Sequence, residues 1–554
     1  MNPAPPPPAW ANQLTELFYS GSTVLFALHG NTQDLVPNGD GFSPLPDFLA
    51  QQIFGRWDLV LYYDLARGLR AFAGSDAARL KEMVLLANRK VGDLATARRD
   101  PAMAFALLDR FVQNNIMAAD ADRISAAVVI DHASFLLPAG EPGRLSVPAA
   151  TQVVTLLNWA ASPHLKRLNM AFLVIDEKLS ALNERLTTSP HTAAIEIPLP
   201  DEATRARFAP ELAAQTAGLT LLDLRALKES KEPLEPKRLR ELKKMLIERQ
   251  SQGLLEFIEP RWNFSNWIGH PPIQQRLRDD ATLLRQGNLN ALPMGYLVCG
   301  PVGTGKSFLA QCLAGEIGIP CVTLRNFRSK YVGETEGNLE RLLNLLRALG
   351  PVIVVVDEAD AALGDRDQEG DSGTGSRVFS MIATQMGDTR YRGKILWMLL
   401  TARPDLLPID LKRQGRAEVH IPLSYPADAA QVRAMFLAMA RKAHTPLAEE
   451  DIPPIPHLGQ LSGADVEGIV GRAARQALLA GAAGITREAL AAAVAEFLPS
   501  TQSLEKEMQE IAAILECTDR QFLPPEILEK MNAYGGREKL QERYTQLRRM
   551  IELA

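Results

Sequence analysis

The sequence predicts an α/β protein in which two parallel sheets follow one another along the chain. Short apolar runs rich in Val, Ile and Leu alternate with helix-like stretches, as is typical of strands covered by helices on both faces. These runs form two sets. The first set comprises residues 23–28, 59–63, 126–130, 171–175 and 194–197, and the second comprises residues 295–299, 321–324, 352–356, 396–401 and 418–421. A length of 554 residues accommodates both sheets and further helical parts.

The spacing of the two sets indicates an internal duplication. The interval from Asp131, which ends one strand, to Asp176 equals the interval from Asp357 to Ala402. Any doubly wound sheet gives similar spacings, so coincidence is the alternative.

The chain divides into parts at changes of composition. We expect a flexible Pro-rich arm at residues 1–20, the first α/β domain at 21–205, a helical linker at 206–260, the second α/β domain at 261–427, a helical lid at 428–500 and a C-terminal helical extension at 501–554. The linker contains a basic amphipathic helix at 237–250, whose Lys and Arg side chains either hold a partner or form a solvated face.

Composition excludes several classes of protein. The 60 Lys and Arg against 65 Asp and Glu give a formal charge of -5, so no general attraction to nucleic acid or anionic membrane is encoded. Four cysteines without a C-x-x-C pair and scattered histidines argue against a disulfide scaffold and a protein-built zinc site. No apolar run approaches the ~20 residues of a membrane span. No Lys or Arg precedes Arg56, so neither a signal peptide nor a mitochondrial transit peptide is indicated. We therefore expect a soluble, cytoplasmic protein.

The second set opens with a phosphate-binding loop. The pattern G-x-x-x-x-G-K-S follows an apolar strand and precedes a helix, which is the context this loop requires. It consists of Gly300, Pro301, Val302, Gly303, Thr304, Gly305, Lys306 and Ser307, and Phe308 continues the helix. The glycines let backbone N–H groups converge on phosphates at a helix N-terminus. We expect Lys306 to reach the β and γ phosphates of ATP and Ser307 to bind Mg²⁺. A glycine-rich turn is the alternative.

A carboxylate pair completes this predicted site. Asp357 and Glu358 follow the apolar run 352–356. We assign Asp357 to the metal and Glu358 to the attacking water as general base, because one carboxylate cannot fill both roles. Both motifs end strands, where open α/β sheets bind ligands.

The stretch from about Trp262 to Phe497 resembles an AAA ATPase module of the clade that contains katanin, spastin and FtsH. Besides the two motifs above, the resemblance includes residues 329–334, 413–416 and 462–465. More narrowly, residues 253–257, 371–374 and 517–520 resemble proteins of the hypothetical chloroplast frame forty-six type and their bacterial relatives. The implied fold is a parallel-sheet P-loop AAA module with a helical lid, preceded by a degenerate AAA-like α/β domain and a helical linker.

The resemblance also implies roles for single residues. Arg413 and Arg416 match the paired arginines that reach the γ-phosphate of a neighbouring subunit, which implies a ring, taken as a hexamer. Surface cations at a turn are the alternative. The resemblance places Gly463 and Ala464 at the start of the helix that closes the lid over ATP. It adds Ile268 and Gly269 to the nucleotide contacts.

A further loop matches the aromatic-hydrophobic-glycine loop that lines the pore of such rings and grips an extended polypeptide. Its residues are Lys330, Tyr331, Val332 and Gly333. A core tyrosine is the alternative. An acidic loop around residues 365–375 either faces the pore as well or is simply solvated.

Two departures from the family pattern stand out. Ala402 occupies the place of an Asn that helps to orient the lytic water, and losing one such hydrogen bond costs about 2 to 4 kcal/mol of transition-state stabilisation. Thr401 is the candidate substitute. Ala417 and Glu418 replace the usual Phe-Asp after the second arginine, so the contact with a neighbouring subunit could differ in geometry.

The first set lacks phosphate chemistry. The loop at residues 29–34 has no Gly-Lys-Ser, and Asp131 has no Glu beside it. We therefore predict a catalytically inactive domain that serves as a scaffold or an adaptor-docking surface.

The leading hypothesis is a ring-forming, Mg²⁺-dependent ATPase that remodels or threads a protein substrate. The chain has no H-E-x-x-H motif, so an in-chain metalloprotease is excluded. One alternative is a scaffold protein in which ATP sets the oligomeric state and Ala402 makes hydrolysis slow. A nucleic-acid motor is a third possibility, against which the acidic balance and the Tyr331 loop count.

Overall fold

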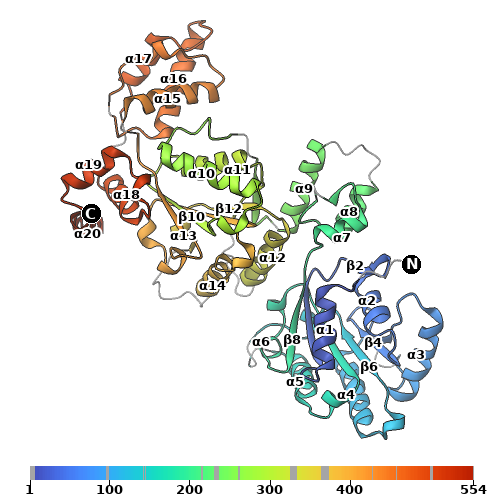
Figure 1. The fold of residues 1–554 in the computed structure, drawn as a ribbon. Coiled ribbons are helices and arrows are strands. Elements are labelled where there is room, and N and C mark those ends of the chain that lie inside the picture. The colour runs from blue at the N-terminus through green and yellow to red at the C-terminus, as the bar shows by residue number, and fades with distance from the viewer. Residues whose placement is uncertain are drawn as a thin grey trace. The chain divides into compact units, whose positions relative to one another are not determined.

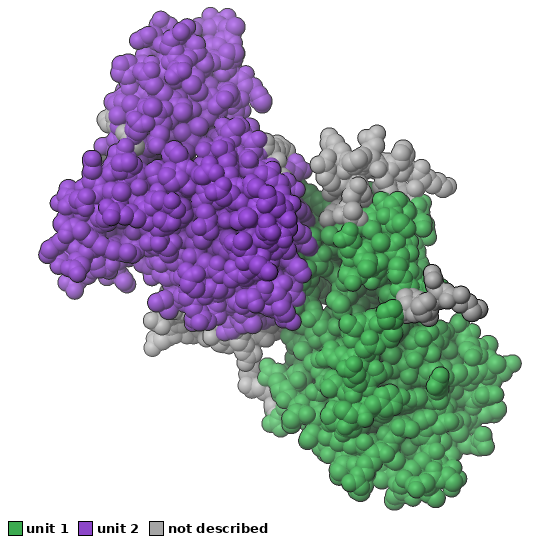
Figure 2. All heavy atoms as spheres, in the orientation of Figure 1, with its two compact units in different colours: residues 1–252, 327–349 green, residues 253–326, 350–554 purple. Residues whose placement is uncertain are grey.

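The computed structural model describes residues 6–94, 99–140, 143, 145–213, 216–229, 236–251, 253–259, 262–324, 334–363, 374–426, 428–456, 458–498 and 503–552. The chain divides into two compact units, coloured separately in Figure 2. The first unit comprises residues 1–252 and 327–349, and the second comprises residues 253–326 and 350–554.

The first unit contains a six-stranded sheet in the order β5-β4-β6-β7-β1-β8, of which β4, β6 and β8 are labelled in Figure 1. The strands are β1 (Leu25–Gly30), β4 (Leu59–Tyr63), β5 (Arg70–Ala71), β6 (Ala126–Ile130), β7 (Met170–Ile175) and β8 (Thr192–Ile197). All pair in parallel except the edge strand β5, which runs antiparallel to β4. Strands β4, β6 and β7 are buried along their whole length, because apolar residues occupy both faces.

Helices bury the sheet of the first unit, and polar caps fix where several of them begin. The larger helices are α1 (Ala9–Tyr19), α3 (Ala77–Lys90), α4 (Pro101–Met117) and α5 (Val147–Ala161). Asp100 caps α4 by accepting from the Ala102 N–H, and Pro101 suits the first helical position because it lacks an N–H. Trp159 of α5 is buried in the core and donates its indole N–H to Asp109 at 2.8 Å.

Further elements complete the first unit. They are the hairpin β2 (Leu35–Asn38) with β3 (Gly41–Pro44), and helices α2 (Leu45–Phe48), α6 (Glu184–Thr187), α7 (Glu202–Phe208), α8 (Leu221–Lys228), α9 (Pro236–Gln250) and α12 (Glu334–Ala348). Helix α12 joins this unit through an ion pair of Arg341 with Glu177 at 2.7 Å.

The second unit contains another six-stranded sheet, in the order β14-β10-β13-β12-β11-β9. The strands are β9 (Leu255–Ile258), β10 (Gly295–Cys299), β11 (Cys321–Leu324), β12 (Val352–Val356), β13 (Ile395–Thr401) and β14 (Val419–Pro422). Again all are parallel except the edge strand β9, which pairs antiparallel with β11. Strand β9 lies within the segment for which the sequence predicts a helical linker, because a run of four residues interrupted by Glu256 is too short to stand out.

The helices of the second unit belong to three groups with separate cores. Helices α10 (Pro271–Arg285), α11 (Lys306–Ile317), α13 (Ala359–Leu363) and α14 (Thr374–Met386) accompany the sheet. Helices α15 (Ala429–Lys442), α16 (Gly463–Leu479) and α17 (Arg487–Ala495) lie in the segment 428–500, for which the sequence predicts a lid. Helices α18 (Ser503–Glu516), α19 (Pro525–Ala533) and α20 (Arg537–Glu552) lie in the segment 501–554, for which it predicts an extension.

The fold class is confirmed, and the five parallel strands of the two sheets have the same order, β8-β1-β7-β6-β4 and β14-β10-β13-β12-β11. The antiparallel edge strands differ, because β5 follows β4 in the chain whereas β9 precedes β10. His132 and Glu358, which follow the acids at the ends of β6 and β12, both have left-handed backbones, with φ of 51° and 47°. The likeness agrees with the hypothesis of an internal duplication.

None of the helices in the described residues combines the length and apolar composition that a membrane crossing requires.

Candidate functional site

The predicted phosphate loop and carboxylate pair line one cavity of about 610 Å³ in the second unit. The cavity lies where β10, β12 and β13 end, at the carboxyl edge of the sheet. Its lining includes Val302, Gly303, Gly305, Lys306, Ser307, Phe308, Asp357, Glu358, Thr401, Ala402, Gly463 and Ala464. Segments distant in the sequence thus meet as the motifs predict.

Backbone geometry explains the glycines of the loop. A Cβ on Gly300 would lie 2.2 Å from the carbonyl oxygen of Leu423, so a side chain cannot be accommodated there. Gly305 precedes α11 with φ of 86°, a left-handed conformation that favours glycine. The loop therefore leads directly into α11, and the backbone N–H groups at the N-terminus of this helix are available to bind an anion.

The ammonium group of Lys306 lies on the loop itself. Nζ donates to the carbonyl oxygens of Gly300 at 2.7 Å and Pro301 at 3.0 Å. Burial lowers the pKa of Lys306, and the nearby Asp357 opposes that shift. The loop thus holds a desolvated cation beside the helix N-terminus.

Ser307 and Asp357 form the oxygen pair expected of a Mg²⁺ site. The hydroxyl of Ser307 donates to Oδ2 of Asp357 at 2.8 Å, while Oδ1 of Asp357 accepts the Glu358 N–H at 3.0 Å. A hydroxyl and a carboxylate are hard ligands, and Mg²⁺ is usually held by one or two protein oxygens together with substrate phosphates. The described residues contain no larger cluster of His, Cys, Asp and Glu that could hold a metal. The donor set therefore fits Mg²⁺ and ATP.

The exposed Glu358 lines the same cavity, and its carboxylate has no hydrogen-bond partner among the described residues. Such a carboxylate is available as a general base.

The hydroxyl of the neighbouring Thr401 is already engaged in hydrogen bonds with other residues. Its side chain is buried, and its hydroxyl donates to Oδ1 of Asp360 at 2.6 Å and accepts the Arg403 N–H at 2.8 Å. Because a hydroxyl has a single hydrogen, Thr401 has none left to donate to a water in the cavity. With Ala402 beside it, the end of β13 offers no side-chain donor there.

The predicted lid residues reach the site, whereas Ile268 and Gly269 lie beside it. The Gly463 N–H donates to the Gly303 carbonyl at 3.0 Å, so α16 contacts the phosphate loop directly. Ile268 and Gly269 instead line a small separate cavity of about 50 Å³ that also touches Thr304 and Gly463.

The arginine pair does not line the cavity. Arg413 is 61% exposed with Nε 3.4 Å from Asp410, whereas Arg416 is half-buried and donates to the Asp410 carbonyl at 2.7 Å. Burial and the nearby Arg413 lower the pKa of Arg416. A role toward a neighbouring subunit requires such a position outside the subunit's own site.

The predicted pore loop, Lys330 to Gly333, and residues 365–373 of the acidic loop lie outside the described residues.

Among the cavity residues to which the sequence assigns no role are Arg403, Lys442, Glu467 and Gln509. Lys442 of α15 pairs with Glu467 of α16 at 2.8 Å and lies over the ring of Phe308. Gln509 belongs to α18 of the C-terminal extension. No local sequence signal marks these residues, because only tertiary packing brings them to the loop.

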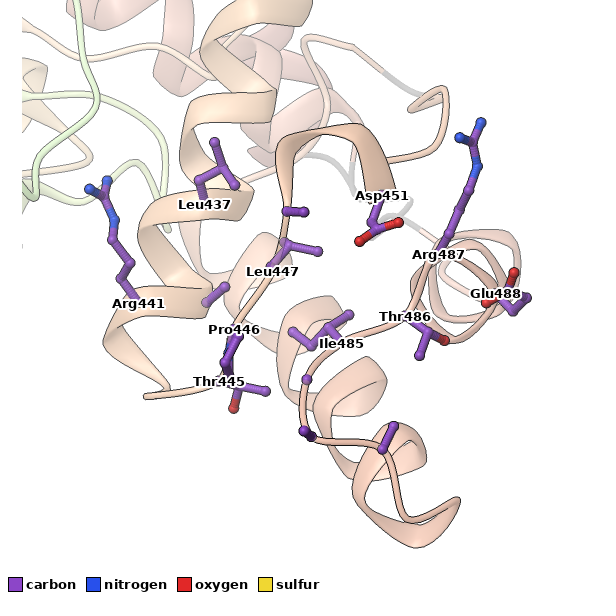
Figure 3. Close-up of a pocket in the computed structure, with 15 residues that line it drawn as sticks. Leu437, Arg441, Thr445, Pro446, Leu447, Asp451, Ile485, Thr486, Arg487 and Glu488 are labelled. Atoms are coloured by element: carbon purple, nitrogen blue, oxygen red, sulfur yellow. The ribbon is translucent and has the colours of Figure 1, made fainter.

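A larger hollow, of about 960 Å³, lies in the lid and carries no phosphate chemistry (Figure 3). Leu437, Leu447 and Ile485 supply its apolar lining, and Asp451 and Arg487 are among its charged residues. Its lining contains a single glycine, Gly484, and no lysine, so volume alone does not identify the site.

The corresponding edge of the first unit is occupied by structural contacts. Gly30 takes the place of Gly300, since a Cβ there would lie 2.6 Å from the Ile197 carbonyl. The buried Asp34 then accepts from the Leu221 and Leu222 N–H groups at 2.9 and 3.0 Å and so caps α8. Burial raises the pKa of Asp34.

Asp131 of the first unit, in the place of Asp357, accepts a hydrogen bond from the Tyr62 hydroxyl.

Comparisons with known proteins agree with this geometry. Residues 2–198 match the family model described as "AAA+ chaperone, N-terminal Rossmann-like domain", and residues 296–425 match "ATPase family associated with various cellular activities (AAA)". The matches confirm the family resemblance that the motifs predict.

Curated relatives are similar to part of the chain. It is 30% identical over 252 residues to ATP-dependent zinc metalloprotease FtsH 3 of Sphaerobacter thermophilus, covering 44% of this chain and 51% of that protein. It is 31% identical over 181 residues to the Cell division cycle protein 48 homolog of Archaeoglobus fulgidus, covering 32% and 24%. It is 34% identical over 137 residues to the uncharacterized AAA domain-containing protein ycf46 of Trieres chinensis, covering 24% and 27%. The chain thus spans about half of the first relative and about a quarter of the other two.

Proposed function

We propose that this chain, in which an AAA ATPase domain follows an AAA+ chaperone N-terminal domain, is a Mg²⁺-dependent ATPase that forms a ring and remodels or threads protein substrates. The observation that carries the proposal is the single cavity that Lys306, the Ser307–Asp357 pair and Glu358 share. Arrangements of this kind place a triphosphate, its metal and a general base in one site.

Each residue has a distinct task in this proposal. Backbone N–H groups at the start of α11 and the Lys306 ammonium bind the phosphates, which requires Lys306 to leave the loop carbonyls. Ser307 and Asp357 hold Mg²⁺, which neutralises phosphate charge when bound. Glu358 accepts the proton of the attacking water, and a closed lid with Gly463 and Ala464 excludes other water.

The ring is proposed from the arginine pair. Arg413 and Arg416 lie outside the subunit's own cavity, and we assign them to a neighbour's ATP, as cations supplied in trans act in phosphoryl transfer. The proposed pore loop around Tyr331 would then contact the polypeptide. We further assign residues 21–205 as a docking domain for adaptors or substrates and the cytoplasm as the compartment.

Protein as the substrate class is supported by a relative named an ATP-dependent zinc metalloprotease, since that name states a protein substrate. This chain lacks the metalloprotease motif, so remodelling or threading, rather than cleavage, is the activity proposed.

The proposal is tested by ATP turnover measured as a function of protein concentration. We expect turnover per subunit to rise as rings form. Arg416→Ala should abolish that rise while leaving ADP affinity within about threefold, because it acts on the neighbour's transition state. Glu358→Gln with ATP should retain a bound protein client. Turnover that is independent of concentration and unaffected by Arg416→Ala would refute the ring.

A second candidate, a slow nucleotide-gated scaffold, is favoured by one observation. The end of β13 offers no donor to the lytic water, since Ala402 has none and the Thr401 hydrogen is committed to Asp360. Comparing wild type with Glu358→Gln separates the two functions. Equal rates would favour the scaffold, whereas a large loss in the variant would favour the ATPase.

A further inference from the structure

The C-terminal extension is fastened to the AAA domain around the nucleotide cavity. Glu516, at the end of α18, pairs with Lys412 at 3.0 Å, and the hydroxyl of Thr518 accepts the His420 N–H at 3.0 Å. Phe522 is buried in the same core as α10 and β10. These contacts fix the position of α18 relative to the phosphate loop.

Two side chains hold the loop at Val302, one from α18 and one from the segment after β14. The side-chain oxygen of Gln509 accepts the Val302 N–H at 3.2 Å, and the hydroxyl of Tyr425 donates to the Val302 carbonyl at 2.8 Å. Lys506 lies over the Tyr425 ring, 5.7 Å from its centre. Both backbone groups of this exposed loop residue are therefore held by side chains.

The orientation of the Gln509 amide follows from this contact. The Val302 N–H is a donor, so the group facing it must be Oε1, which leaves the NH₂ group of Gln509 on the other side. That NH₂ group makes no hydrogen bond within the described residues, and Gln509 lines the same cavity as Glu358 and Ala402. A carboxamide donor is thus present in a site whose β13 residue has none.

We propose that Gln509 supplies, from the C-terminal extension, the carboxamide donor that Ala402 lacks, and that its NH₂ group orients the reacting atoms at the γ-phosphate. This proposal rests on the proposed ATPase function and names a further residue of the same site. Oε1 fixes the amide on the phosphate loop, so the donor is held in place before ATP arrives. Such preorganisation is what makes a single donor effective in a site from which water is excluded.

The assignment gives the extension a catalytic task. If the extension separates from the AAA domain, the cavity loses its amide donor while Lys306, Ser307 and the two acids stay in place. ATP binding and ATP hydrolysis are therefore expected to respond differently to changes at Gln509.

The test uses the full chain and measures kcat and KM for ATP with Mg²⁺, together with the dissociation constant of ADP. Gln509→Ala is expected to lower kcat by about 10- to 100-fold and to change ADP affinity by less than about threefold. Gln509→Glu keeps the acceptor for the Val302 N–H but lacks the NH₂ group, so it should lose as much kcat and guards against a folding defect in the alanine variant. Gln546→Ala, an exposed glutamine of α20, is the matched control and should behave as wild type.

The decisive measurement is whether a second substitution restores the kcat of the Gln509→Ala variant. Ala402→Asn should restore most of the kcat in the Gln509→Ala background. An unchanged kcat in Gln509→Ala overturns the proposal. So does a parallel loss of kcat and ADP affinity without rescue, which would mean that Gln509 only braces the loop. A wild-type chain with no turnover would instead refute the ATPase function, and the role of Gln509 with it.

Discussion

Glu418 allows a test of which contacts stabilise the turn that carries Arg413 and Arg416. Its carboxylate accepts two hydrogen bonds from Arg392, at 2.8 and 3.2 Å, and one from the Gly415 N–H at 3.0 Å. Gly415 lies between Arg413 and Arg416 and has φ of 86°, so this bond fixes the turn that carries both arginines. The perturbation is Glu418→Ala.

The expected loss in the free energy of unfolding follows from the burial of the Glu418–Arg392 pair. The side chains of Glu418 and Arg392 are 13% and 22% exposed, and hydrogen bonds to charged groups contribute roughly 1.5 to 3 kcal/mol each. Arg392 keeps its bond to the Leu292 carbonyl and some solvent, which reduces the loss. We expect the free energy of unfolding to fall by about 3 kcal/mol. The exposed pair Lys539–Glu542 is the matched control, and Glu542→Ala should cost under about 0.5 kcal/mol.

Two measurements check this reasoning. Urea denaturation gives the free energy, and hydrogen exchange of the peptide spanning residues 411–419 should quicken about tenfold or more in Glu418→Ala, because the Gly415 N–H loses its acceptor. ATP turnover should fall while ADP affinity stays within about threefold, since the arginines serve the neighbouring site. A loss of stability under 1 kcal/mol, or unchanged exchange of that peptide, would refute the reasoning.

Three further predictions concern single changes. Gly30→Ala forces a Cβ to 2.6 Å from the Ile197 carbonyl at φ of 96°, so thermal unfolding should show a loss of about 2 kcal/mol or more, with ADP affinity unchanged as the check that the second unit is intact. Burial raises the pKa of Tyr425 to about 12, so its bond to Val302 stabilises the fold fully below about pH 10 and is lost as the pH rises through 12. The stability advantage of wild type over Tyr425→Phe, about 1 kcal/mol, should therefore vanish over that range in urea titrations. Chelation of Mg²⁺ should stop turnover reversibly, and Asp357→Asn should raise the Mg²⁺ concentration needed for half-maximal turnover at least tenfold; an unaffected requirement would count against the assigned metal site.

Much of the fold is predictable because its strands are locally distinctive. Central parallel strands are buried on both faces, so β6 and β12 read as continuous apolar runs, and the boundaries expected from the sequence coincide with those observed. The phosphate loop is equally local, since one short segment supplies its glycines, lysine and hydroxyl. Edge strands lack such a signal. Strand β9 carries Glu256 within four residues and owes its conformation to pairing with β11.

The parts of the site that escape prediction depend on distant packing. Gln509 stands on an ordinary amphipathic helix, and only the anchoring of Glu516 and Phe522 carries it to Val302. From the sequence alone, it is plausible that Thr401 takes over the water-positioning role of the missing Asn. It becomes untenable once Asp360 is seen to take the hydroxyl hydrogen, and that contact joins the end of β13 to α13, which no local pattern relates.

In the two units, the same order of parallel strands is combined with opposite arrangements at the carboxyl edge of the sheet, one open to an anion and one filled by a carboxylate. In the second unit, Asp357 keeps one oxygen beside the Ser307 hydroxyl, and the loop leaves the N-terminus of α11 free for an anion. In the first unit, the equivalent Asp131 is bonded to Tyr62, and the loop carries Asp34, whose carboxylate already occupies the N-terminus of α8. A phosphate there would have to displace a buried carboxylate from the helix that it caps. The first unit is therefore expected to bind no nucleotide. Asp34→Ala should loosen the start of α8 rather than create an ATP site, so hydrogen exchange of residues 221–228 should become faster. ATP binding gained by that variant would contradict the assignment.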